Sequence, residues 1–314
     1  MNSDNLPKVA ILMATFNGAR FIEEQLRSIT AQVGVHVNIY ISDDMSTDKT
    51  VMLIKNSMSK QRNQITLLPE VIASGGAGQN FFRLVKDVAL GEYEYFAFSD
   101  QDDIWQDKKI LKAVNQLKIN NADGYSSSVV ALFANGGKKF IKKDYQQKKY
   151  DYFFEGPGPG CTFVISRKLF LSLRDFIFKN YQGMEAIYYH DWFIYAFARK
   201  NDFKWLIDGQ SHILYRQHEG NDTGANIGFL AMILRLKVIW SFWARDQAYV
   251  IAKLLDYEKV MLYYFSGNPK SILRLSIFFL DFRRSAIDAI VLLFLGLTGR
   301  LRPQNASILN KLIK

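Results

Sequence analysis

Short apolar runs alternate with amphipathic segments along the first part of the chain. Residues 8–14 (KVAILMA) form a continuous apolar run after Lys8, which is typical of a strand covered on both faces. Residues 21–32 follow with apolar side chains at helical spacing. The same alternation predicts further strands at 37–43, 65–69 and 93–99, and further helices at 47–58, 79–90 and 107–118. This order predicts an α/β fold with a doubly wound, mostly parallel sheet.

After residue 120 the pattern is less regular. The basic, tyrosine-rich stretch 138–160 is interpreted either as a mobile surface loop that closes on a site or as a solvated connection. Around it the sequence predicts strands at 124–135, 161–166, 203–208 and 212–217 and a helix at 191–200.

From about residue 228 the chain is apolar with helical spacing, in the segments 229–244, 271–299 and 307–314. A membrane-spanning helix needs about 20 apolar residues. Charged side chains interrupt the longest segment too often for that, so the pattern favours helices that lie in a membrane interface. The alternative is that they pack on the preceding domain or on the partner of a homodimer. The interrupting residues are Arg274, Asp281, Arg283, Arg284 and Asp288.

The charge distribution supports the interfacial interpretation. Of a net charge of +10, an excess of eight lies between Asn226 and the C-terminus, with 13 Lys and Arg against five Asp and Glu. Such an excess beside apolar helices favours an anionic membrane surface, and the basic stripe with spaced aromatics expected for nucleic-acid binding is not evident. A single cysteine, Cys161, excludes an internal disulfide and fits a reducing compartment. Without a recognisable secretory signal, we expect the protein at the cytoplasmic face of the membrane.

Three carboxylates, Asp100, Asp102 and Asp103, directly follow the predicted strand 93–99. Ligands of open α/β sheets bind at the carboxyl ends of the strands, and carboxylates this close repel one another unless a cation lies among them. In extended backbone Asp100 and Asp102 point to one side, while Asp103 points elsewhere or begins a turn. Such a pair suits Mg²⁺ or Mn²⁺ with positions left for phosphate oxygens. The alternative is an N-cap cluster for a helix near Asp107.

A second acidic pair, Asp43 and Asp44, ends the strand 37–43. These carboxylates can accept hydrogen bonds from a base or a ribose, whereas helix capping by Asp44 or Ser46 is the competing interpretation. Thr15 and Asn17 follow the first strand and are expected at the same edge. No G-x-G-x-x-G or Walker A sequence occurs, which disfavours a dinucleotide cofactor or P-loop chemistry.

Several of these segments together resemble the nucleotide-sugar half of glycosyltransferase family 2. They are VAILMATFNGARFIEEQLRSI, ISDDMSTDKT and FAFSDQDDIW, and the likeness continues through GPGCTFVISRKLF, YYHDWFIYAFA and YRQHEGNDTGA. It is closest to the bacterial rhamnosyltransferase-like branch and covers roughly residues 8–226. The resemblance implies a GT-A fold with a mixed sheet, a nucleotide-diphosphate sugar donor, Mn²⁺ or Mg²⁺ as cofactor, and inversion at the anomeric carbon.

By resemblance, residues 1–226 form the catalytic domain, with a donor half at about 1–120 and an acceptor half at about 121–226. Residues 227–314 form the C-terminal helical region. Asp43 resembles the base-binding carboxylate, with Thr15, Asn17 and Asp44 beside it. Asp100 and Asp102 resemble the family's Asp-x-Asp pair, with Asp102 as the direct metal ligand. The glycine-rich segment 70–81 departs from the pattern of this branch and leaves Asn80 undefined as a donor contact.

The acceptor side depends on Asp191, which opens a predicted helix. Inverting transfer needs one base to take the proton of the acceptor hydroxyl, and Asp191 resembles that base; an N-cap role is compatible. His190 is expected either to orient the site or to pack. Five further side chains complete the expected site: His218 as a third metal or diphosphate contact, Arg216 and Asp103 as phosphate or acceptor contacts, and Trp105 and Trp192 as packing residues or acceptor-site walls.

The sequence therefore predicts an enzyme that moves a sugar, for example L-rhamnose from dTDP-L-rhamnose, to a lipid-linked or cell-surface glycan. Two alternatives are a sugar nucleotidyltransferase and a non-catalytic subunit for glycan assembly. The first usually carries a glycine-rich, basic phosphate loop near its first strand, and MATFNGAR matches such a loop poorly. The second would have no need to hold repelling carboxylates together.

Overall fold

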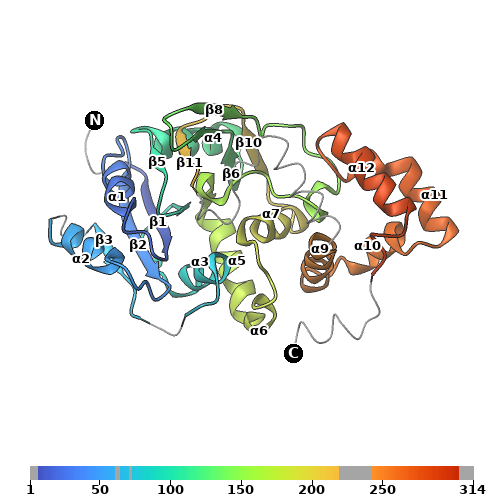
Figure 1. Cartoon of the computed structure of the whole chain (residues 1–314), viewed down its shortest axis with the longest axis horizontal. Helices are drawn as coiled ribbons and strands as arrows, with labels where there is room; N and C mark the ends of the chain where they lie inside the picture. The colour runs from blue at the N-terminus through green and yellow to red at the C-terminus, as the bar shows by residue number, and fades with distance from the viewer. Residues whose placement is uncertain (1–5, 61–63, 71–72, 219–241, 304–314) are drawn as a thin grey trace.

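A computed structural model describes residues 6–60, 64–70, 73–218 and 242–303 (Figure 1). Its centre is a seven-stranded sheet in the order β10-β6-β9-β4-β1-β2-β3. All paired neighbours are parallel except β9, which is antiparallel to β4 and β6. The strands are β1 Lys8–Thr15, β2 His36–Asp43, β3 Ile65–Leu67, β4 Tyr95–Ser99, β6 Gly124–Ser127, β9 Val164–Ser166 and β10 Trp205–Asp208. The predicted mixed α/β sheet is confirmed.

The continuous apolar run of β1 is explained by burial on both faces of this sheet. Ala10, Leu12 and Ala14 lie in one hydrophobic cluster with α3, α5 and α7, whereas the alternating residues Val9, Ile11 and Met13 lie in a second cluster with α1 and α4. The helices of this part are α1 Ile22–Thr30, α2 Thr50–Lys60, α3 Ala77–Asp87, α4 Lys109–Asn120, α5 Arg167–Lys179, α6 Tyr181–Met184 and α7 His190–Lys200.

A second, four-stranded sheet lies beside the first in the order β5-β11-β7-β8. Its strands are β5 Ile104–Trp105, β7 Val129–Leu132, β8 Lys138–Ile141 and β11 Ile213–Arg216. The single strand expected at 124–135 is wrong, because the chain leaves the first sheet after Ser127 and pairs in the second from Val129. The stretch 138–160 is also more than a loop, since it contains β8 and the 3-10 helices η2 Asp151–Phe153 and, at its end, η3 Gly160–Thr162.

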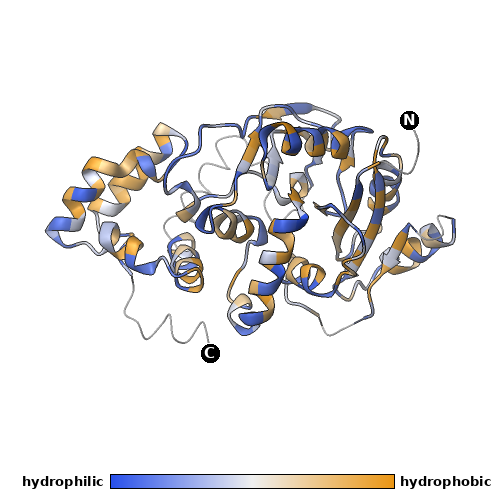
Figure 2. Ribbon diagram, turned by 180° about the vertical axis from the view of Figure 1, so that it is seen from behind, coloured by the Kyte–Doolittle hydropathy of each residue, from blue (hydrophilic) through white to orange (hydrophobic). Residues whose placement is uncertain are grey.

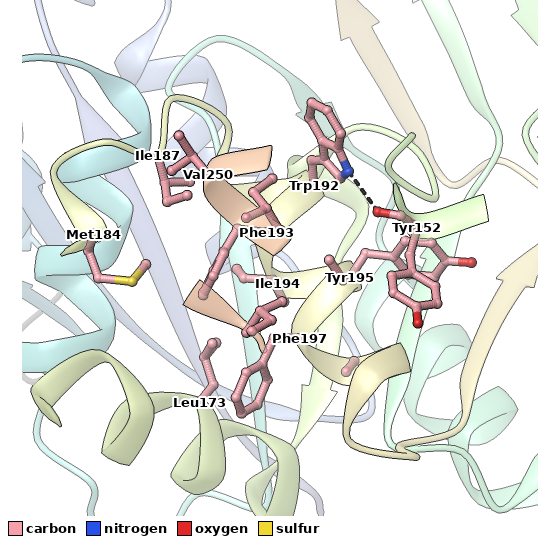
Figure 3. Packing of buried hydrophobic residues seen from close by; sticks show 14 of the residues in the cluster. Tyr152, Leu173, Met184, Ile187, Trp192, Phe193, Ile194, Tyr195, Phe197 and Val250 are labelled. Carbon is pink, nitrogen blue, oxygen red and sulfur yellow. Dashed lines mark hydrogen bonds between the residues drawn. The ribbon is translucent and has the colours of Figure 1, made fainter. Parts of the chain in front are cut away.

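Four helices lie within the described residues 242–303: α9 Trp243–Leu254, α10 Glu258–Phe265, α11 Pro269–Phe278 and α12 Ala286–Leu297, with the 3-10 helix η4 Phe279–Asp281. α9 is integral to the core, and its Val250 belongs to the same buried cluster as Phe193 of α7 (Figure 3). The segments expected at 229–244 and 307–314 lie almost wholly outside the described residues, as does the expected domain boundary at 226.

The pair α11 and α12 forms one end of the molecule (Figure 1), and Figure 2 shows long apolar stretches along both. Both helices begin with a residue type that favours the N-cap position. Asn268 accepts a hydrogen bond from the Ser271 N–H, and Ser285 accepts one from the Asp288 N–H. Within the parts of the chain that are described, no helix combines the length and apolarity needed to cross a bilayer.

Candidate functional site

The carboxyl ends of β1 and β2 meet because the two strands pair in register from Lys8 with His36 to Thr15 with Asp43. Asp43 is 8% exposed, and its carboxylate accepts three hydrogen bonds: from the Thr15 hydroxyl at 2.8 Å and from the Ser46 hydroxyl and N–H at 2.7 and 2.8 Å. A carboxylate offers about four acceptor positions. Asp43 is therefore rigidly held with capacity for one further donor.

Asn17 joins the turn after β1 to the turn after β2. Its backbone has a φ of 47°, its amide oxygen accepts from the Thr47 N–H at 2.8 Å, and its own N–H donates to the Ser46 hydroxyl at 2.8 Å. Asp44 accepts from the Ser74 N–H, which draws the glycine-rich segment to this edge. The capping interpretation for Asp44 and Ser46 is wrong, because α2 begins only at Thr50.

The sequence left Asn80 undefined and missed Arg83, both on α3. Asn80 is 2% exposed and donates from Nδ2 to the Ser42 carbonyl at 2.8 Å, while its buried Oδ1 has no hydrogen-bond partner among the described residues. Arg83 is 7% exposed and donates to the Ser42 hydroxyl at 2.9 Å and to the Pro69 carbonyl. Their spacing of three residues on one helix was the available signal that they share a face.

The backbone of residues 100–103 is not extended. β4 ends at Ser99 and the chain bends at residues 101 and 102, so the expected geometry, in which Asp103 points elsewhere, is wrong. Asp100, Asp103 and Cys161 each bring a ligand atom within 4.8 Å of the others. The interpretation as a cap cluster is also wrong, because the residue at the N-cap of α4 is Lys108.

Asp102 instead contacts His218, whose Nε2 lies 2.6 Å from Asp102 Oδ2. β11 pairs antiparallel with β5, Leu214 opposite Ile104, which carries His218 back to the acidic cluster.

Arg216, which ends β11, also contacts the acidic cluster: its N–H donates to Asp103 Oδ1 at 3.1 Å, its Nε to the Asp102 carbonyl at 2.8 Å, and its Nη2 to Glu24 at 2.6 Å. Through these hydrogen bonds Arg216 holds Asp102 and Asp103 in place.

Asp103 is almost fully buried, at 1% exposure. Burial, reinforced by the neighbouring charge of Asp102, raises the pKa of Asp103 to about 8. Lys109 is also buried, 3.5 Å over the ring of Trp105, and burial lowers its pKa to about 8. Trp105 is 3% exposed and therefore a packing residue.

The acidic cluster fits a divalent cation. Asp103 Oδ2 is buried and has no hydrogen-bond partner among the residues described; Asp100, Asp103 and Cys161 bring ligand atoms within 4.8 Å of one another, and His218 lies against Asp102. Oxygen-rich sets of this kind suit Mg²⁺ or Mn²⁺, and an imidazole is compatible with Mn²⁺.

Asp191 lies in the first turn of α7, one residue inside the helix, and Tyr189 occupies the N-cap, so the N-cap interpretation is wrong. Its Oδ1 accepts from the Trp192 N–H at 2.7 Å. Burial raises the pKa of Asp191 to about 6, against the opposing effects of that hydrogen bond and of the charge of Lys143. A carboxylate with such a pKa is a suitable general base near neutral pH.

η3 connects Asp191 to the acidic cluster. A Cβ added to Gly160 would lie 2.5 Å from His190 Nε2 and 3.3 Å from Asp191 Cβ, so Gly160 packs directly on both residues. The next residue, Cys161, belongs to the group with Asp100 and Asp103. Two consecutive residues of η3 thus lie against His190 and Asp191 on one side and against Asp100 and Asp103 on the other.

His190 and Trp192 have packing roles. The His190 ring stacks on Phe81 with centroids 3.9 Å apart, and burial lowers its pKa to about 3, so it is neutral. Trp192 is 7% exposed and donates from its indole nitrogen to the Tyr152 carbonyl at 2.9 Å (Figure 3). Trp192 therefore anchors the stretch around η2 to α7.

Comparison with known proteins agrees with this geometry. Residues 10–180 match the model of glycosyl transferase family 2. The chain is 42% identical over 283 residues to the dTDP-rhamnosyl transferase RfbG of Shigella flexneri, covering 90% of this chain and 98% of that protein. It is 26% identical to the UDP-Glc:alpha-D-GlcNAc-diphosphoundecaprenol beta-1,3-glucosyltransferase WfgD of Escherichia coli, over 51% of this chain and 61% of that protein.

Among solved structures, the fold is similar to a mannosyltransferase from Pyrobaculum calidifontis in complex with GDP-Man and Mn²⁺. The TM-score is 0.52 at 14% identity, covering 98% of this chain and 85% of that one. The fold and the site together define a GT-A glycosyltransferase. This chain belongs to glycosyl transferase family 2.

Proposed function

We propose that this glycosyltransferase transfers L-rhamnose from dTDP-L-rhamnose to a lipid-linked glycan, with inversion at the anomeric carbon. The observation that carries the donor assignment is the likeness to a dTDP-rhamnosyl transferase along nine-tenths of the chain. The name of WfgD, a relative that acts on a diphosphoundecaprenol-linked sugar, supports a lipid-linked acceptor.

The proposed nucleoside side of the donor site consists of Asp43, Thr15, Asn17 and Asp44. Asp43 has one acceptor position left for a base or ribose donor, and the Thr15 and Ser46 hydroxyls fix its orientation. The buried Oδ1 of Asn80 is a second acceptor at this edge. A thymine base presents one N–H donor, which such acceptors would satisfy.

Asp100, Asp102 and His218 would hold the divalent cation, Mn²⁺ or Mg²⁺, with Asp103 and Arg216 supporting them. When bound, the ion offsets the negative charge that develops on the leaving diphosphate. The chain's own contribution is the ordering of these ligands: Arg216 fixes the backbone carbonyl of Asp102 and the carboxylate of Asp103. Ligand orientation of this kind strengthens metal binding.

Asp191 is the proposed base. In its ionised form it would accept the proton of the acceptor hydroxyl while that oxygen attacks the anomeric carbon and the bond to the diphosphate breaks. A single carboxylate suffices, unlike the pair used in glycoside hydrolysis, because a diphosphate whose charge is offset by a cation leaves without a general acid. Gly160 and the stacked His190 fix the position of Asp191.

The C-terminal helices are the proposed contact with an anionic membrane at its cytoplasmic face, where a lipid-linked acceptor is held. Leu273, Ile277, Ile287, Ile290 and Phe294 of α11 and α12 are 58% to 75% exposed. An exposed apolar patch of this extent marks a membrane or protein contact. The net excess of basic residues in this part of the sequence favours the membrane over a homodimer partner.

A transfer assay tests the donor and the acceptor together. Purified protein with Mn²⁺ and a lipid-linked acceptor fraction is offered dTDP-L-rhamnose, and labelled glycolipid and free dTDP are measured. We expect both products in equal amounts. Transfer from another nucleotide sugar alone would overturn the rhamnose assignment, and pyrophosphate release would instead indicate a nucleotidyltransferase.

A further inference from the structure

The connection between η4 and α12 reaches back from the C-terminal helices into the catalytic domain. Arg283 and Arg284 lie on this connection, and both bind residues 143–156, which we call the acceptor-side segment. Arg283 donates to the Phe154 carbonyl at 2.8 Å. In the same region the Tyr150 N–H donates to the Asp281 carbonyl at 2.8 Å, so the two parts are joined at several backbone positions.

Arg284 makes the most extensive of these contacts, and its side chain is only 5% exposed. Its backbone N–H donates to Glu155 Oε1 at 2.7 Å, and its Nε lies 3.4 Å from the same oxygen. One guanidinium nitrogen donates to the Lys143 carbonyl at 3.2 Å and the other to the Gly156 carbonyl. Arg284 therefore joins the two ends of the acceptor-side segment.

The opposite side of this segment contacts the start of α7. A Cβ added to Gly156 would meet Trp192 Cα at 3.5 Å, and the Trp192 indole binds the carbonyl of Tyr152. Lys143, at the other end, acts on the charge of Asp191. The backbone that Arg284 binds thus lies against Trp192, the residue after Asp191, and carries Lys143, whose charge acts on Asp191.

The buried carboxylate near Arg284 has a second, closer cation. Asp151 is fully buried and lies 3.8 Å from Arg284 Nε, but it also pairs with Arg199 at 2.9 Å and accepts from the Tyr195 hydroxyl at 3.0 Å. When a hydrogen-bonded cation remains beside a buried carboxylate, most of the desolvation cost of that carboxylate is still offset. The contacts that distinguish Arg284 are therefore those with the carbonyls of Lys143 and Gly156. These hydrogen bonds fix the backbone of the acceptor-side segment at both of its ends.

We propose that Arg284 is a positioning residue, which holds the acceptor-side segment against Asp191 so that the C-terminal helices complete the acceptor site. The proposal rests on the assignment of Asp191 as the base. It gives the C-terminal region a part in transfer that is separate from any contact with lipid, since these contacts come from the connection between η4 and α12 and not from the exposed apolar residues of α11 and α12.

The test compares Arg284→Gln with Arg284→Lys, and with Arg167→Gln as matched control. Arg167 also binds backbone carbonyls, those of Leu90, Gly91 and Tyr93 at 2.8 to 3.1 Å, and belongs to neither the acceptor-side segment nor the C-terminal helices. For Arg284→Gln we expect kcat/KM for the acceptor to fall roughly 10–100-fold, since small misplacements of a reacting group cost that much. The dissociation constant of dTDP with Mn²⁺, measured by calorimetry, should not change. Arg284→Lys should recover part of the loss, and Arg167→Gln should keep the kcat/KM of the unaltered protein.

An equal loss of dTDP affinity, or an unchanged kcat/KM for the acceptor, would overturn the proposal. If Arg284→Gln fails to fold, as judged by its melting temperature, Glu155→Gln weakens the same junction from the other side while Arg284 keeps its carbonyl contacts. Glu155→Gln should then also lower kcat/KM for the acceptor, by a smaller factor, and leave the dissociation constant of dTDP unchanged. If it does not, the proposal is overturned. The split is measured with whichever nucleotide sugar supports transfer, so an error in the rhamnose assignment leaves this test intact.

Discussion

The Nε2 of His218 lies 2.6 Å from Oδ2 of Asp102, although 116 residues separate them in sequence. The contact depends on the short antiparallel pair of β5 and β11, which returns the chain to the acidic cluster that follows β4. It places an imidazole nitrogen beside the carboxylate that the sequence already favoured as the metal ligand.

Replacing His218 by Ala is expected to weaken the apparent affinity for Mn²⁺ by roughly 10–100-fold, as loss of a metal-site partner commonly does. Titration of activity with Mn²⁺ measures this. His36→Ala, at the exposed start of β2 and the opposite end of the sheet, is the control. Asp102→Ala should abolish metal-dependent transfer altogether, and full turnover of that variant in EDTA would refute the metal assignment.

Replacing Asp191 by Asn is expected to lower kcat by roughly 10²–10⁴-fold, because the amide cannot take the proton of the acceptor hydroxyl. The change is close to isosteric, so dTDP binding measured by calorimetry should persist. A parallel loss of nucleotide affinity would indicate that Asp191 supports the fold or the donor site instead.

The pH dependence of transfer should follow the raised pKa of Asp191. With a pKa of about 6, the carboxyl is protonated and inactive below that value, so kcat/KM for the acceptor should fall ~tenfold per pH unit on the acid side. The stability of the fold depends on pH in the opposite direction. A folded pKa raised above the ordinary 3.8 contributes stability that is present below pH 3.8 and is lost as the pH rises through about 6. A rate that stays constant from pH 7 down to 5 would contradict the assignment.

Gly160→Ala is expected to destabilise the protein by about 1–3 kcal/mol, the usual cost of overpacking a core, and to lower transfer. The added Cβ would meet His190 Nε2 at 2.5 Å, and the stacking of that ring on Phe81 leaves it little room to move. Gly156→Ala is the matched control, because its Cβ would meet Trp192 Cα at an ordinary 3.5 Å. Thermal unfolding of both variants decides the point, and equal melting temperatures would count against the tight packing of η3.

The triple replacement Ile287→Ser, Ile290→Ser and Phe294→Ser is expected to abolish flotation with vesicles of phosphatidylglycerol and phosphatidylethanolamine. Fully burying an apolar side chain of this size contributes about 1.5–3 kcal/mol, so three account for most of an interfacial affinity. Ile119→Ser removes an apolar side chain of similar exposure, 79%, from α4 and should float like the unaltered protein. Retained flotation would exclude this surface. A change from dimer to monomer without any lipid binding would favour the homodimer instead.

Local sequence was sufficient for much of the donor half. The apolar run of β1 and the register from Lys8 to Thr15 follow from side chains that are buried on both faces, so the position of Asp43 at the end of β2 was predictable. The capping interpretations failed because α2 and α4 begin several residues later than the polar clusters before them, at Thr50 and Lys109. Residues 124–135 were wrongly read as one strand, because the β pattern does not record a change of sheet.

The sequence by itself determined the α/β class, the family resemblance and which acidic residues end the strands, because these depend on residue order and on the burial pattern of single elements. Tertiary structure alone decided that Asp103 and Cys161 lie with Asp100, that His218 faces Asp102, and that Arg284 binds the segment beside Asp191. Each of these contacts joins side chains from elements far apart in sequence. Strand pairing and helix packing set their geometry, and these depend on the whole core.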